Sequence, residues 1–180
     1  ITTLTEVIAM SMEKGQLSIH TENFLPIIKK WLYSDRDIFI RELISNCCDA
    51  VAKRRMVGQI PDDYQPRVTV RVDKEHRILS FTDNGVGMTA EEVRKYINQV
   101  AFSGANDFME KYKDSGEQII GHFGLGFYSA FMVADKVRID TLSCLPDAKA
   151  VCWESDGSVE YTMEETEREE VGTTVTLYLN

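Results

Sequence analysis

The sequence predicts an α+β fold, a two-layer sandwich in which helices cover one face of a mostly antiparallel sheet. Two observations predict it. One long region, residues 24–56, repeats its apolar residues with helical spacing, whereas several later segments alternate apolar and polar residues as strands do. With 180 residues and 43% apolar composition, the chain suits one domain, residues 1–180, with a core of its own.

The first half of the chain is predicted to contain a broken helix, a hairpin and a second helical region. The helical pattern is expected to break near Ser34, which can serve as the N-cap of the second piece. Residues 67–73 and 78–82 alternate on either side of a turn and predict a β-hairpin. Thr89, followed three residues later by Glu92, forms a capping box that opens another helix.

The second half is predicted to begin with a mobile segment and to end in strands. Residues 101–118 are polar and contain glycine, which is typical of a mobile stretch. A glycine-rich turn and a helix from about Phe127 are expected next. Strands are then expected around residues 136–141, 150–154 and 173–179.

Composition and charge exclude several classes of function. A net charge of -9 disfavours binding to nucleic acid or to an anionic membrane. The one dense basic cluster, Lys53–Arg55, is explained equally well by a solvated helix end and by a phosphate-facing role. No apolar run approaches the roughly 18 residues that span a bilayer, and residues 1–15 lack the pattern of a signal peptide. We therefore expect a cytoplasmic protein.

The four cysteines, Cys47, Cys48, Cys144 and Cys152, form no C-x-x-C pair. Neither a disulfide framework nor a zinc site is predicted. Reduced, buried or half-buried thiols are the favoured interpretation.

Four polar residues of the second helical piece form a narrow stripe. Glu42, Asn46, Asp49 and Lys53 are spaced i, i+4, i+7 and i+11, which places them within an arc of about 60° that borders the apolar side. An amide oxygen suits Mg²⁺ and a carboxylate can orient water, so the stripe could hold a metal-bound anion. Taken alone, an ordinary amphipathic helix with surface ion pairs is the commoner explanation.

A D-x-G-x-G motif follows the hairpin. Asp83 shares strand parity with Leu79 and Phe81, so its carboxylate should face the core and need hydrogen-bond donors there. An adenine amino group is one such donor. Gly85 and Gly87 would let the backbone approach a flat ring, and Met88 could pack on it. A plain turn between strand and helix explains the segment as well.

Two further segments carry weaker signals. Residues 121–127 read G-x-x-G-x-G and open a predicted helix, where backbone amides can bind phosphate. The spacing is neither that of a P-loop nor that of a Rossmann fingerprint. Thr173 has the parity of Val175 and Leu177, so its hydroxyl should face inward, although inward threonines are usually structural.

The order and spacing of these four motifs resemble the GHKL (Bergerat) ATPases, which include gyrase, heat-shock protein 90, histidine kinases and MutL. The match tightens at Arg41–Asn46, Asp83–Thr89, Ser103–Gly104 and Gly124–Ser129, which are similar to signatures of the heat-shock protein 90 family, the bacterial HtpG type in particular. The resemblance runs from about Glu22 to Leu179 and is highly specific.

The resemblance implies a role for each candidate residue. Glu42 would be the general base that activates water, Asn46 the Mg²⁺ ligand, and Asp83, assisted by Thr173, the acceptor for the adenine amino group. The polar part of the pocket would be lined by Asp49 and Lys53, and its apolar walls would be Ala50 and Met88. Gly87 would bind the cofactor through a close approach of its backbone. Phosphate contacts would come from Gly121, Phe123, Gly124, Gly126 and Phe127. Residues of about 98–117 would form a lid.

The resemblance also implies cofactors and partners. These are ATP or ADP with Mg²⁺, client proteins that are unfolded or partly folded, a homodimer of the full-length protein, and inhibitors that imitate adenine. A following domain would supply an arginine to the γ-phosphate, so hydrolysis by residues 1–180 alone should be weak. Another GHKL ATPase, and a nucleotide-sensing interaction module without catalysis, remain as alternatives.

The sequence departs from the family pattern in three places. Phe102 stands where a basic residue usually precedes the Ser-Gly of the lid, which would weaken contact with the γ-phosphate. The usual small pair after Asn46 is Cys47–Cys48, which would alter packing and make the site sensitive to thiol reagents. Residues 1–9 have no recognised counterpart in the family, and residues 1–14 of the single domain are interpreted as an upstream extension.

Overall fold

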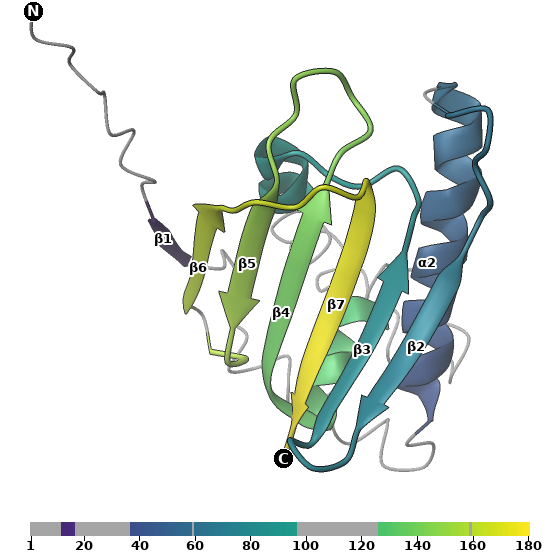
Figure 1. The fold of residues 1–180 in the computed structure, drawn as a ribbon. Coiled ribbons are helices and arrows are strands. Elements are labelled where there is room, and N and C mark those ends of the chain that lie inside the picture. The colour runs from purple at the N-terminus through teal and green to yellow at the C-terminus, as the bar shows by residue number, and fades with distance from the viewer. Residues whose placement is uncertain (1–11, 17–36, 59, 97–125, 159) are drawn as a thin grey trace, which may run out of the picture.

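In the computed structural model, seven strands form one sheet in the order β1-β6-β5-β4-β7-β3-β2, and each neighbouring pair is antiparallel (Figure 1). The structure describes residues 12–16, 37–58, 60–96, 126–158 and 160–180. The strands are β1 (Glu13–Gln16), β2 (Val68–Asp73), β3 (Ile78–Asp83), β4 (Ala134–Leu142), β5 (Val151–Ser155), β6 (Glu160–Glu165) and β7 (Gly172–Leu179).

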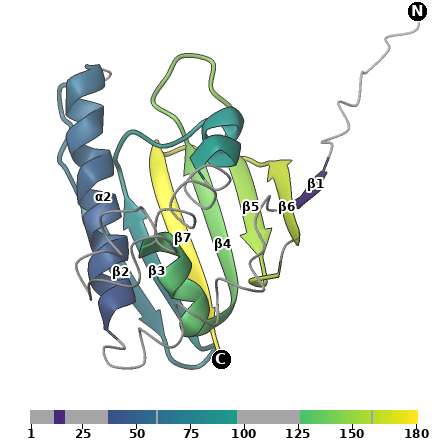
Figure 2. The same ribbon diagram turned by 180° about the vertical axis from the view of Figure 1, so that it is seen from behind.

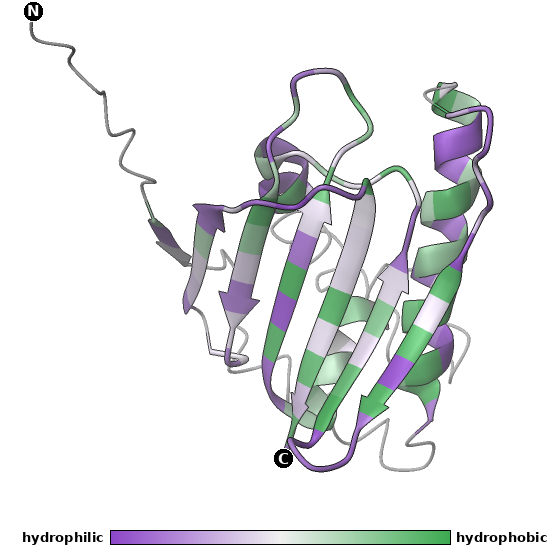
Figure 3. Cartoon of the chain, in the orientation of Figure 1, coloured by the Kyte–Doolittle hydropathy of each residue, from purple (hydrophilic) through white to green (hydrophobic). Residues whose placement is uncertain are grey.

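Helices cover one face of this sheet, as Figure 2 shows. They are α2 (Ile38–Val57), the 3₁₀-helix η1 (Gly126–Met132) and a helical segment at residues 90–96. The core lies between the two layers, where Leu43, Phe81, Trp153 and Leu177 are at most 2% exposed. Figure 3 shows the matching alternation of apolar and polar bands along the strands. The predicted α+β sandwich is therefore confirmed.

Helix α2 forms because its apolar residues recur on one side. Ile38, Phe39, Leu43 and Cys47 are buried against the sheet. The helix ends at Gly58, whose positive φ of 78° lets its N–H reach back to the carbonyl of Arg54. The first predicted helical piece and its break at Ser34 lie outside the described residues.

The predicted hairpin and capping box are both present. Strands β2 and β3 pair along their whole length, with Val68 opposite Asp83. The Thr89 N–H donates to the Glu92 carboxylate and the Glu92 N–H donates to the Thr89 hydroxyl, each at 3.2 Å. These reciprocal bonds fix where the helical segment begins after the D-x-G-x-G motif.

Two strands were not predicted, and one helix differs from its prediction. Strand β6 buries only Tyr161 and Met163 among outward glutamates, so its alternation is too short to stand out in the sequence. Strand β1 has four residues, EKGQ, with no apolar side chain. The helix predicted from about Phe127 is a 3₁₀-helix of seven residues that runs directly into β4.

The predicted mobile segment, the lid at residues 98–117 and most of the G-x-x-G-x-G motif lie outside the described residues. Within the described part of the chain, no helix combines the length and apolar character needed to cross a membrane.

Candidate functional site

Residues from all four predicted motifs line a pocket of about 160 Å³ between α2 and the sheet. The predicted site residues that line it are Asn46, Asp49, Ala50, Lys53, Asp83, Gly87, Met88, Phe127 and Thr173. The pocket is smaller than the roughly 300 to 1,000 Å³ that encloses a drug-sized ligand. It could therefore enclose one ring system while the rest of the ligand lies outside.

Two larger hollows lie elsewhere, of about 870 Å³ beside the β5–β6 hairpin and about 650 Å³ on the open face of β2 and β3. Both are lined mainly by polar or charged side chains, and no predicted site residue lines either. We take the smaller pocket as the candidate site because elements far apart in the sequence converge on it.

Of the five remaining predicted site residues, two are described by the structure and three are not. Glu42 is on α2, half-buried, but does not line the enclosed pocket. Gly126 begins η1, while Gly121, Phe123 and Gly124 lie outside the described residues. The structure thus brings together the part of the site that was predicted to surround the base.

Asp83 ends β3 with its carboxylate inside the pocket. It is 5% exposed, on the same face of the strand as Phe81, as its parity predicts. Its Oδ1 accepts the backbone N–H of Gly85 at 2.8 Å. Burial raises the pKa of this carboxyl to about 6, although the Gly85 N–H, the Cys47 thiol and the charge of Arg168 all oppose the rise. The carboxylate is therefore ionised at neutral pH but poorly solvated.

The two glycines after Asp83 serve backbone packing. A Cβ on Gly85 would lie 2.4 Å from the carbonyl carbon of Ala50, and the next residue, Val86, donates its N–H to that carbonyl at 2.9 Å. Gly87 has a φ of 64°, and its Cβ would lie 1.9 Å from the Leu142 carbonyl oxygen. The expectation that Gly85 gives room to a ligand is wrong, since α2 fills that room; Gly87 also lines the pocket.

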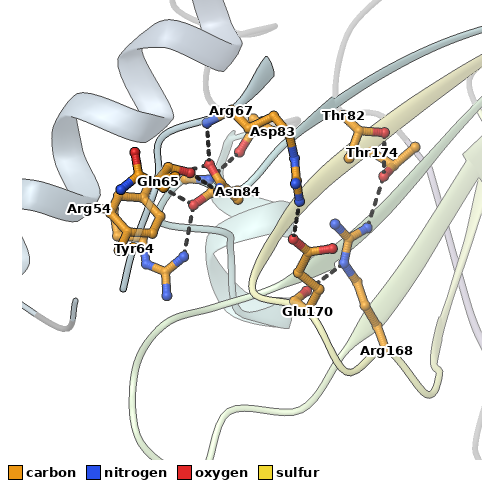
Figure 4. Close-up of polar contacts among 11 residues, drawn as sticks. Arg54, Tyr64, Gln65, Arg67, Thr82, Asp83, Asn84, Arg168, Glu170 and Thr174 are labelled. Atoms are coloured by element: carbon orange, nitrogen blue, oxygen red, sulfur yellow. Dashed lines mark hydrogen bonds and ion pairs between the residues drawn. The ribbon is translucent and has the colours of Figure 1, made fainter. Parts of the chain in front are cut away.

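Asn84 ties this loop to the end of α2 and to the start of β2 (Figure 4). Its Oδ1 accepts the Arg67 N–H at 2.8 Å and its Nδ2 donates to the Gln65 carbonyl at 2.7 Å. Its own carbonyl accepts from the Arg54 guanidinium and the Tyr64 hydroxyl, both at 2.8 Å. These bonds fix the backbone at Asn84 and therefore the position of the preceding residue, Asp83.

The basic cluster at the end of α2 divides between two environments. Arg54 is 7% exposed, with its guanidinium 4.6 Å from the centre of the Tyr64 ring. Its bond to Asn84 makes it structural, so neither of the two interpretations offered for the cluster describes it. Lys53, by contrast, is exposed and lines the pocket.

Asn84→Ala is expected to destabilise the domain by about 2 to 3 kcal/mol, because the Arg67 N–H and the Gln65 carbonyl lose their partner. Urea unfolding monitored by circular dichroism measures it. Tyr64→Phe, which removes one donor from the same network, should cost about 1 kcal/mol. Equal stabilities for Asn84→Ala and the parent would show that the loop is held without this side chain.

Thr173 faces the pocket at the start of β7, as predicted, and its hydroxyl lies 2.8 Å from that of Thr141 on β4. Thr141 is fully buried, accepts the Met88 N–H at 2.9 Å and donates to the Gly172 carbonyl at 3.2 Å. The sequence analysis missed Thr141. Its parity with Val137 and Ile139 on the predicted strand could have identified it.

Tyr96 is the second residue that the sequence analysis missed. It lines the pocket, and its hydroxyl accepts from the Asn46 amide nitrogen at 3.4 Å. Desolvation, and then the nearby carboxylates of Glu42 and Asp49, raise the pKa of Tyr96 to about 12. The polar stripe of α2 therefore converges on this hydroxyl. Helical spacing from Thr89 and Val93 could have placed Tyr96 on the inner side.

The stripe offers one ligand type suited to a divalent cation. The Asn46 amide directs its nitrogen to Tyr96, which leaves its oxygen for other partners. Among the described residues, no three His, Cys, Asp or Glu side chains cluster as a metal site would require. Mg²⁺ is commonly held by one or two protein oxygens, substrate phosphates and water, so the residues present fit a Mg²⁺ ion that arrives with a phosphorylated ligand.

A family model described as histidine kinase-, DNA gyrase B- and HSP90-like ATPase matches residues 34–173. The chain is similar to chaperone protein HtpG of Bacteroides thetaiotaomicron, at 51% identity over 94% of this chain and 25% of the relative. The HtpG of Porphyromonas gingivalis is 49% identical over 93% and 25%, and that of Chromobacterium violaceum 41% over 94% and 28%. The chain thus spans about a quarter of the length of these relatives.

Proposed function

The chain belongs to the family of histidine kinase-, DNA gyrase B- and HSP90-like ATPases, and we propose that it is the ATP-binding and slowly hydrolysing domain of a chaperone of the heat-shock protein 90 type. The observation that carries the proposal is the buried carboxylate of Asp83, which lines a pocket of about 160 Å³. A buried carboxylate needs a donor, and the amino group of adenine supplies one.

The residues around Asp83 suit the rest of an adenine nucleotide. Ala50, Met88 and Phe127 offer apolar surface to a base, and Thr173 offers a hydroxyl beside the carboxylate. Asn46 and Lys53 lie along α2, where an amide oxygen would hold Mg²⁺ and an ammonium would face phosphate. Glu42 lies one helical turn before Asn46, and we assign to it the activation of the attacking water.

In the full-length protein, we propose that ATP closes the lid and pairs two such domains in a homodimer that acts on unfolded or partly folded client proteins. The relatives are named as chaperones, which supports this assignment. Inhibitors that imitate adenine should compete with ADP for the same pocket.

The direct test is calorimetric titration of the domain with ADP, with and without Mg²⁺. Saturable binding at one site per chain, displaced by an adenine-mimicking inhibitor, is expected. If a folded domain bound neither ADP nor ATP, the motifs would persist as architecture only, and the proposal would fail.

Residues 1–180 alone are expected to hydrolyse ATP at least about 10-fold more slowly than the full-length protein, although they should still bind ATP. The reason is that a following domain is proposed to supply an arginine to the γ-phosphate. Phosphate release assayed on both chains measures the difference. Equal rates would mean that no other part of the protein completes the site.

Binding should weaken on acidification, because a protonated Asp83 is a weaker acceptor for the amino group of the base than the carboxylate is. With a pKa of about 6, the affinity is expected to fall about 10-fold per pH unit below that value and to be nearly constant above pH 7. An adenine-mimicking inhibitor without phosphate is the ligand to titrate, because the phosphates of a nucleotide would themselves titrate in this pH range. A flat profile from pH 7 to pH 5 would exclude Asp83 as the acceptor.

A further inference from the structure

Three buried polar residues form a row across the inner face of the sheet, on the neighbouring strands β3, β7 and β4 (Figure 1). Asp83 on β3 lies opposite Thr173 on β7, and Thr173 lies opposite Thr141 on β4. Asp83 and Thr173 line the pocket, whereas Thr141 is fully buried behind them and does not. The function proposed above therefore gives Thr141 no contact with the ligand.

The hydroxyl of Thr141 makes every hydrogen bond that a hydroxyl can make. It has one proton to donate and two lone pairs with which to accept. It accepts the Met88 N–H at 2.9 Å, and it lies 3.2 Å from the carbonyl oxygen of Gly172, which can only accept. The Thr141 proton therefore goes to Gly172, and the second lone pair is left for the Thr173 hydroxyl at 2.8 Å.

This count fixes the direction of the bond between the two threonines, because Thr173 must donate and Thr141 must accept. The reverse direction would give the single Thr141 proton two acceptors, and the Thr173 proton would have no partner among the described residues. The Thr173 proton thus points toward β4, on the side of β7 opposite to Asp83.

Asp83 is consequently short of donors. An ionised carboxylate has about four lone-pair sites, and the described residues supply one hydrogen bond to this carboxylate, from the Gly85 N–H at 2.8 Å. Side chains directly opposite on antiparallel strands have Cβ atoms about 4.5 to 5.5 Å apart. Thr173 could therefore give Asp83 a second donor by a change of rotamer, but its bond to Thr141 opposes that change.

On the basis of the proposed nucleotide function, we infer that Thr141 is a positioning residue for recognition of the base. By accepting the Thr173 proton, it keeps that hydroxyl from bonding to Asp83 and leaves the carboxylate free for the amino group of adenine. A buried acceptor without enough donors gains most from a ligand that brings one. Thr141 thus prepares the carboxylate for the base without touching the base.

Thr141→Val nearly keeps the shape of the side chain but cannot accept the Thr173 proton. That hydroxyl is then expected to turn to Asp83, to stabilise the charged carboxylate and to compete with the ligand. The pKa of Asp83 should fall by about one unit, and the ADP affinity at pH 7 should fall about 10-fold. Nuclear magnetic resonance of the Asp83 carboxyl carbon in the ligand-free domain measures the pKa, and calorimetry measures the affinity. The inference requires both changes, so the absence of either would overturn it.

A double-mutant cycle separates proton placement from packing. Thr173→Val has no hydroxyl to turn, so adding Thr141→Val to it should leave the pKa of Asp83 unchanged. An equal shift in both backgrounds would come from packing and would overturn the inference. Thr141→Ser keeps the hydroxyl and should bind ADP within about threefold of the parent. Thr82→Val is the matched control, since it breaks a threonine pair with Thr174 on the opposite face of the sheet (Figure 4), and it should change neither quantity.

Thr173→Val alone decides the matter if circular dichroism shows that Thr141→Val does not fold. The Thr173 proton does not reach Asp83 in the parent, so its removal should change the pKa of Asp83 by less than about 0.3 unit. A rise of about one unit would show that this hydroxyl already serves the carboxylate, and would overturn the inference. Every variant retains the other polar and charged side chains that act on this carboxyl or line the pocket, which are Cys47, Asp49 and Lys53 on α2 and Arg168 before β7.

Failure of the proposed function gives a different pattern. If the parent bound no ADP, the proposed function would fail and the role of Thr141 in base recognition with it, whatever the pKa of Asp83 showed. If the parent bound ADP and Thr141→Val bound it equally well, the inference about Thr141 alone would fail.

Discussion

Asp83→Asn is expected to weaken ADP binding by at least about 100-fold, the largest effect on affinity of any single change in this pocket. Asparagine has nearly the same shape but presents an amide, so its NH₂ group can face the amino group of adenine as donor against donor. The buried amino group of the ligand would then lose its acceptor, which costs more than an exposed bond would. Calorimetry of the parent and variant with ADP and Mg²⁺ measures the effect.

The same substitution should stabilise the ligand-free domain at neutral pH. The carboxyl of Asp83 has a pKa of about 6 in the folded state against an ordinary value of 3.8. Between these values the folded state binds more protons than the unfolded state, so the contribution of Asp83 to stability falls as pH rises. Above pH 6 the accumulated penalty is about 3 kcal/mol, at about 1.4 kcal/mol per unit.

Asparagine carries no charge, so this penalty is absent in the variant. We expect Asp83→Asn to unfold at higher urea concentration than the parent at pH 7, by up to about 3 kcal/mol, and the difference to vanish near pH 4. Thr173→Val, which keeps the carboxylate, is the matched control. The difference between its free energy of unfolding and that of the parent should be the same at pH 7 and pH 4. If the ADP affinity of Asp83→Asn equalled that of the parent, Asp83 would have no role in base recognition. If the variant were less stable than the parent at pH 7, the ionised carboxylate would be adequately solvated in the folded parent.

Strand parity and helical spacing predicted the inner part of the site well. Asp83 and Thr173 are both buried on the face that parity gives them, and Asn46, Asp49 and Lys53 all reach the pocket from one side of α2. Each of these inferences needs only the geometry of one element. The geometry of single elements does not say which of them adjoin in the fold. That information came from the family resemblance.

The network around the D-x-G-x-G loop could not be predicted in this way. Arg54 and Asn84 are 30 residues apart, and their bond depends on how the end of α2 meets the end of β3. A basic residue at a helix end normally lies in solvent, so its burial under Tyr64 is a tertiary effect. The packing of Gly85 against α2 has the same origin, because the close approach exists only once both elements are in place.

Glu42→Ala in the full-length protein is expected to reduce the rate of ATP hydrolysis at least about 100-fold, the usual effect of losing a general base. ADP affinity should remain within about twofold, because Glu42 lies outside the enclosed pocket that would hold the base. The charges of the Glu42 and Asp49 carboxylates both contribute to the raised pKa of Tyr96. Glu42 is therefore on the polar side of the site, where the phosphates would lie.

Glu91→Ala is the matched control for this prediction, since Glu91 is an exposed carboxylate on the helical segment at residues 90–96. It should hydrolyse and bind as the parent does. A Glu42→Ala protein that binds ADP but no longer turns over ATP would support catalysis by Glu42, with binding and chemistry separated along α2. Turnover equal to that of the parent would remove Glu42 from this role. No other described carboxylate on α2 lies between Asn46 and the start of the helix. Such a result would therefore favour a domain that senses nucleotide and signals through its interactions.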